Sequence, residues 1–146
     1  MGPDTFHRAI SYPFGIPARS YIVDGGLHVE LGFSAPMPNL SGRRPVLAVG
    51  SNQSPEQLIR KFKDSGLGPI PVIRARLADF DIVYSSHVAA YGSIPAMLRH
   101  SPGTRVTLFV NWLTPAQETL MHATETATAN YDFGKLDGIE LSLEAG

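Results

Sequence analysis

The chain contains no cysteine, and this absence excludes several kinds of chemistry. Disulfide cross-links, thiolate metal sites and a cysteine nucleophile all need a thiol. Its five histidines also lack the i, i+4 spacing that places two metal ligands on one helix face, so we expect no metal site.

The sequence also lacks an excess of positive charge and a long apolar run. Lys and Arg number 12 against 13 Asp and Glu, for a formal net charge of -1, so no basic face is expected to bind nucleic acid. The basic cluster at residues 60–63 is typical of the exposed side of a helix. No apolar run approaches the ~20 residues that span a bilayer, and the amino terminus lacks the features of a signal peptide. We therefore expect no membrane partner and a cytoplasmic location.

What is present is enough for one domain with a buried core, since 43% of the 146 residues are hydrophobic. Residues 1–44 give weak signals. Within them, Tyr21–Val23 and Leu27–Leu31 flank Asp24-Gly25-Gly26, which predicts a hairpin. Residues 32–45, with three prolines, are typical of a linker. We expect an N-terminal arm over residues 1–44 and the main domain over residues 45–146.

The pattern becomes clearer from residue 45 onward. Val46–Val49 is a short apolar run typical of a strand buried on both faces. Ser54–Gln57 and Thr114–Gln117 each combine a capping residue, a proline and a glutamine at capping-box spacing, so each predicts a helix start.

Strands are predicted for the segments rich in β-branched and aromatic residues. These are Ile70–Arg76, Phe80–Tyr84, Ile94–Leu98 and Arg105–Trp112, with a turn at Ser101-Pro102-Gly103 and a strand or two within Tyr131–Leu143. Many strands with two inserted helices predict an α+β domain with a curled sheet.

Several pieces of the sequence occur in an order that resembles the γ-glutamylcyclotransferase superfamily. They are the loop Leu47-Ala48-Val49-Gly50-Ser51-Asn52, the strand Ala75–Phe80, the strands on either side of Ser101-Pro102-Gly103, and the helix that ends in Thr124-Glu125 with Tyr131 shortly after. The resemblance covers roughly residues 45–133. It implies a small mixed β-barrel flanked by helices, with a small-molecule pocket at the barrel mouth.

The resemblance also implies an activity: cleavage of a γ-glutamyl amine or peptide by cyclisation to 5-oxoproline, without a cofactor. Glu125 would be the general acid/base, and Val49, Gly50, Ser51, Asn52, Tyr91 and Tyr131 would line the substrate site. A turn between a buried strand and a helix start offers backbone N–H groups to an anion. A single carboxylate can accept and return the proton that cyclisation moves.

Three alternatives remain open at this stage. At 100° per residue, Ala116, Leu120, Ala123 and Thr124 share one helix face and Glu125 falls near the opposite side, as an exposed glutamate would. Val49 stands where the family usually has tyrosine, which favours a non-catalytic small-molecule-binding module on the same fold. The N-terminal arm also suggests a self-associating scaffold, and hence a homo-oligomer.

Overall fold

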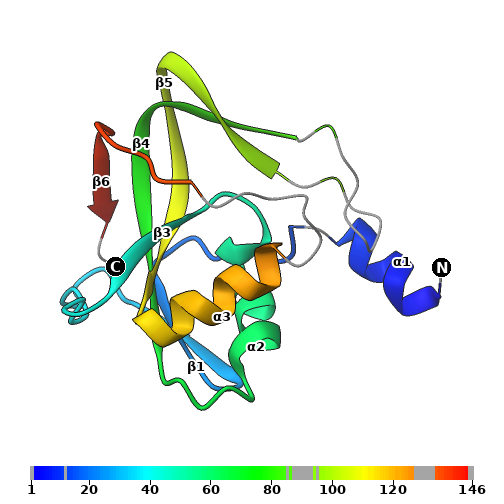
Figure 1. Ribbon diagram of the computed structural model, residues 1–146. Coiled ribbons are helices and arrows are strands. Elements are labelled where there is room, and N and C mark those ends of the chain that lie inside the picture. The colour runs from blue at the N-terminus through cyan, green and yellow to red at the C-terminus, as the bar shows by residue number, and fades with distance from the viewer. Residues whose placement is uncertain are drawn as a thin grey trace.

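The computed structural model describes residues 2–11, 13–84, 86, 94, 96–126 and 134–144 (Figure 1). Along the chain the elements are α1 (Pro3–Ile10), β1 (Tyr21–Asp24), β2 (Leu27–Glu30), β3 (Arg44–Ala48), the 3₁₀ helix η1 (Ser51–Gln53), α2 (Pro55–Phe62), β4 (Ile70–Tyr84), β5 (Ala96–Leu113), α3 (Pro115–Thr126) and β6 (Leu141–Glu144). The predicted α+β class is confirmed.

The strands form one antiparallel sheet in the order β2-β1-β4-β5-β3, with β6 also on β4. The expectation of a mixed barrel is wrong for the described strands, because the sheet has open ends at β2 and β3. The outer edge of β4 is shared by two four-residue strands, β1 and β6, so the sheet is extended by short strands and does not close on β3.

Ser20 joins the two short strands on the outer edge of β4. Its hydroxyl accepts the N–H of Arg74 at 2.9 Å and donates to the carbonyl of Glu144 at 2.7 Å. Arg74 lies just beyond the β1 pairing, which ends at Val72, and begins the β6 pairing. The buried serine thus connects segments from opposite ends of the described chain.

The four central strand predictions merge into two long strands. Ala78 pairs with Arg105 whereas Phe80 pairs with His100, so Ser101–Thr104 form a bulge in β5. Asp79 adopts a φ of 64°, and its carboxylate accepts the N–H of Gly103 at 2.9 Å. The predicted turn at Ser101-Pro102-Gly103 therefore bends the ribbon without ending it, because the neighbouring strand supplies a partner across the bulge.

Other local predictions have mixed outcomes. The hairpin at Gly25 is confirmed, and both helix starts are confirmed in position. The capping box at Ser54 is wrong: the hydroxyl makes no cap bond, and Gln57 accepts instead from Arg60. Helix α1 was not predicted. Residues 44–48 form an edge strand that is exposed at Arg44 and Pro45. Over the predicted run, Val46 and Ala48 belong to the apolar cluster on one face and Leu47 and Val49 pack against the cluster on the other, although Val46 and Leu47 are only partly buried.

Apolar side chains pack on both faces of the sheet. On one face α2 and α3 cover a cluster that includes Tyr21, Leu58, Phe62, Phe109 and Met121. On the other face lies a second cluster, formed by Ala75, Leu77, Leu108 and Val110 with Val49 and Trp112 packed against it. The segment before residue 45 thus contributes Tyr21 to the first cluster. Within the described residues, no helix is long and apolar enough to cross a membrane.

Candidate functional site

The loop at Gly50 links the edge strand β3 to α2 and contains one 3₁₀ turn. The N–H of Gln53 donates to the Gly50 carbonyl at 3.1 Å, and the N–H of Ser54 donates to the Ser51 carbonyl at 2.9 Å. The turn thus uses the later N–H groups for its own hydrogen bonds. The N–H of Ser51, at the start of the turn, takes no part in these two hydrogen bonds.

Three other elements hold this loop in place. The Tyr21 hydroxyl, from β1, donates to the Gln53 carbonyl at 2.6 Å. The Asn111 amide, from β5, donates to the Asn52 carbonyl at 3.3 Å, and the Lys61 ammonium, from α2, donates to the Asn52 side-chain oxygen at 2.9 Å. The loop is therefore a fixed part of the fold, as a preorganised binding loop requires.

Lys61 also brings the loop next to α3. Its Nζ lies 3.8 Å from the sulfur of Met121 as well as 2.9 Å from Asn52 Oδ1. A surface depression of about 440 Å³ borders the same lysine. It is lined by Arg60, Lys61, Asp64, Ser65, Leu67 and Leu120.

The face of α3 predicted from helical spacing is wrong. Gln117, Glu118 and Met121 are buried, whereas Ala116 is exposed. The prediction failed because polar residues with fold-specific partners occupy the buried face. Residues four apart lie on one side of a helix, so the backbone position of Glu125 continues the row of Gln117 and Met121.

The remaining predicted site residues divide into two groups. Val49 packs against the second apolar cluster, and Gly50, Ser51 and Asn52 form the anchored loop. Tyr91, Tyr131 and the side chain of Glu125 lie outside the described part of the structure. The loop and the helix of the prediction are therefore brought together, while the roles of these three side chains stay predictions.

Gln117 fixes the start of α3. It forms the predicted capping box with Thr114: the Thr114 N–H donates to Gln117 Oε1 at 2.9 Å, and the Gln117 N–H donates to Thr114 Oγ1 at 3.3 Å. The side-chain nitrogen of Gln117, Nε2, donates to the carbonyls of Leu67, Gly68 and Pro69, each at 3.1 Å. One side chain thus caps the helix and ties it to the segment that follows α2.

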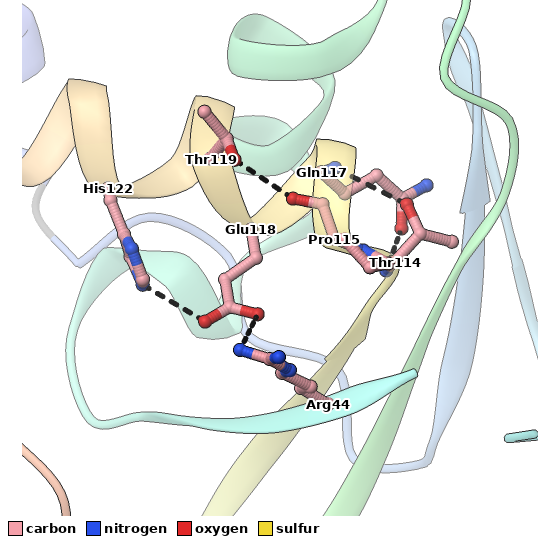
Figure 2. A network of polar contacts seen from close by, with 7 residues as sticks. All are labelled: Arg44, Thr114, Pro115, Gln117, Glu118, Thr119 and His122. Carbon is pink, nitrogen blue, oxygen red and sulfur yellow. Dashed lines mark hydrogen bonds and ion pairs between the residues drawn. The ribbon is translucent and has the colours of Figure 1, made fainter. Parts of the chain in front are cut away.

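Glu118 is a buried acidic residue that the sequence analysis did not single out. Figure 2 shows its carboxylate between His122, one turn later on α3, and Arg44 on β3. Arg44 Nη1 lies 3.6 Å from Oε2, and His122 Nε2 lies 3.9 Å from Oε1. Oε2 is buried and accepts no hydrogen bond from the described residues. The i, i+4 spacing of Glu118 and His122 was visible in the sequence, but the contact with Arg44 was not.

Arg44 thus forms an ion pair with the Glu118 carboxylate, one oxygen of which is shielded from water by burial. Arg44→Met is expected to lower the free energy of unfolding by about 1 kcal/mol, a modest figure because the Arg44 side chain is 70% exposed and the attraction is screened. Glu118→Gln alone should change stability by less than about 0.5 kcal/mol, since it removes a desolvated charge. Urea denaturation of the Arg44→Met/Glu118→Gln double variant should give the stability of Glu118→Gln. Full additivity of the two losses would contradict the pairing.

Among the described residues, no group of three or more His, Asp or Glu side chains could hold a metal ion. Comparisons with protein-family models, with curated proteins and with solved structures give no significant match. The geometry of the Gly50 loop and α3, together with the motif resemblance, is therefore the basis for inferring a function.

Proposed function

We propose that the chain is a γ-glutamylcyclotransferase-like enzyme that cleaves a γ-glutamyl amine or peptide, with Glu125 as general acid/base. In this reaction the α-amine attacks the γ-glutamyl carbonyl carbon, forming the lactam C–N bond of 5-oxoproline. The original amide C–N bond breaks and the amine departs. The carboxylate takes one proton from the α-ammonium before the attack and a second from the same nitrogen as the lactam forms. It passes both in turn to the leaving nitrogen, which departs as an ammonium, so neither water nor a cofactor is consumed.

The observation that carries the proposal is the meeting of the Gly50 loop with α3 at Lys61. Asn52 belongs to the loop, and Met121 lies one helical turn before Glu125 on the same row. The motifs of the resemblance, about 70 residues apart in sequence (121 − 52 = 69), are thus neighbours in space. The Lys61 ammonium adds a positive charge beside the loop and at the border of the depression. Such a charge favours a substrate carboxylate.

The direct test is a panel of γ-glutamyl amines and γ-glutamyl peptides, with 5-oxoproline measured by mass spectrometry. Glu125→Gln keeps the size of the side chain and removes its basicity, so it should lower kcat by about 10²- to 10⁴-fold. Glu56→Gln, on the exposed side of α2, is the matched control and should keep wild-type activity. Activity that survives Glu125→Gln would refute the acid/base assignment, and no product from any substrate of the panel would refute the reaction.

The second candidate is a non-catalytic module that binds a small carboxylate or amide at the same loop. It is favoured by the use of the Asn52 carbonyl and side chain in internal hydrogen bonds to Asn111 and Lys61. It predicts saturable binding of a γ-glutamyl compound by calorimetry with no product after long incubation. More product molecules than protein molecules would exclude it.

A further inference from the structure

Strand β2 is an uncovered edge with apolar side chains on its surface. Among the described strands it pairs only with β1. All four of its residues are exposed, and Leu27 and Val29 are 75% and 67% exposed. Natural edge strands usually avoid such surfaces, because an open row of backbone groups beside apolar side chains recruits another strand.

The hairpin fixes which backbone groups of β2 face outward. The N–H of Leu31 donates to the Ser20 carbonyl at 2.8 Å, on the β1 side. Along an antiparallel strand the N–H and C=O groups alternate in direction, so those of Leu27 and Val29 also face β1. The N–H and C=O groups of His28 and Glu30 therefore face the open edge.

The sequence of this edge is self-complementary. In Leu27-His28-Val29-Glu30-Leu31 a leucine lies two residues from Val29 on either side, and the residues next to Val29 are a histidine and a glutamate, which complement each other. If the strand pairs antiparallel with a second copy about a two-fold axis at Val29, His28 of each copy lies opposite Glu30 of the other. Leu27 then lies opposite Leu31, and the two copies of Val29 face each other on the axis.

The outward backbone groups fit this same register. His28 and Glu30 both face the open edge, so each of the two His28–Glu30 pairs becomes a hydrogen-bonded pair that exchanges two backbone bonds. Val29 becomes a non-hydrogen-bonded pair, with Cα atoms about 4.5 Å apart and side chains in close contact. A shift of the register by one residue would place Leu27 opposite Glu30 and His28 opposite Val29, and so lose both pairings of His28 with Glu30.

We propose that β2 is a dimerisation edge that pairs antiparallel with β2 of a second copy of this chain, centred on Val29. The outward charges on a protective edge strand normally repel a second strand. Here the imidazole of His28 can donate a hydrogen bond to the carboxylate of Glu30 across the axis, and this pairing selects a second copy in this register. The sheet then continues from one copy into the other.

The absence of cysteine makes a cross-linking test direct. Val29→Cys introduces the only thiol of the chain at the two-fold axis, where the Cα spacing of about 4.5 Å lies in the range of disulfides. Under mild oxidation at micromolar concentration this variant should become a covalent dimer within minutes. Tyr84→Cys, at a residue 76% exposed at the far end of β4, is the control and should cross-link at least tenfold more slowly. Equal rates for the two variants would overturn the proposal.

A charge exchange tests the register independently. His28→Glu places Glu opposite Glu30 twice, and should weaken the dimer by roughly tenfold or more in sedimentation equilibrium. The double variant His28→Glu/Glu30→Lys places opposite charges in both pairs and should recover at least the wild-type association. Melting curves of the same samples show that each monomer is folded. A wild-type protein that stays monomeric at high micromolar concentration, or a double variant as weak as the single one, would overturn the proposal.

Discussion

Gln117→Leu is expected to lower the free energy of unfolding by about 3–5 kcal/mol. Leucine has a similar volume but removes the donor to three carbonyls and the acceptor for Thr114 and Arg43. Gln117 is 0% exposed, so water is poorly placed to replace these bonds. Each buried group left without a partner costs about 1–3 kcal/mol, and the losses are less than additive because the three carbonyls share one N–H₂ group.

Urea denaturation measures this effect, and Gln57→Leu is the matched control. Gln57 is also a buried glutamine in the first turn of a helix, but its side-chain oxygen accepts one bond, from Arg60, which is partly exposed. Its replacement should cost less than about 1 kcal/mol. If the two leucine variants are equally stable, the role assigned to Gln117 is wrong. The capping box alone would account for only about 1 kcal/mol of the loss.

Tyr21 is expected to make the fold sensitive to alkali. Its side chain is fully buried, and burial raises the pKa of the phenol well above its ordinary value. The unfolded chain releases this proton near pH 10, while the folded chain keeps it. The contribution of Tyr21 to the free energy of unfolding is therefore fully present below about pH 10. Above that pH the free energy of unfolding falls by about 1.4 kcal/mol per pH unit.

Denaturation curves between about pH 8 and 12 test this dependence. Tyr21→Phe should be less stable than wild type by about 1–2 kcal/mol at neutral pH, because the buried Gln53 carbonyl loses its donor. Its stability should then fall less steeply than that of wild type above pH 10, so the two profiles converge. Tyr84→Phe, at an exposed position, should keep the wild-type profile. Parallel profiles for wild type and Tyr21→Phe would assign the alkaline loss to other groups.

Most features set by neighbours in sequence were predictable from the residues alone, with the capping box at Ser54 as the exception. The turn at Gly25 and the capping box of Thr114 and Gln117 depend on short-range geometry, and both predictions are confirmed. Ser101-Pro102-Gly103 carries the same kind of turn signal. Its outcome was decided by Asp79, more than twenty residues away, whose carboxylate holds Gly103 within a continuous ribbon.

The candidate site was predictable only in part for the same reason. The resemblance led to the Gly50 loop and α3 as neighbours, but the buried face of α3 includes Gln117 and Glu118 beside Met121, and these two polar residues have partners on other elements. A hydropathy pattern cannot recognise a polar residue that is buried because distant groups satisfy it. The role of Glu125 remains a prediction that the activity assay decides.

The position of Ser20 has a consequence for the order of folding. One edge of β4 pairs first with β1 and then with β6, the strand that ends at Glu144. The Ser20 hydroxyl donates to the Glu144 carbonyl, and the two residues are 124 positions apart in sequence. While the chain is being synthesised, β4 and β5 can pair with each other. The outer edge of β4 over Arg74–Leu77, however, has no partner until residues 141–144 have left the ribosome. Until then Arg74–Leu77 is an unpaired strand edge that can pair with a strand of another chain. Protection by chaperones therefore matters most in that interval.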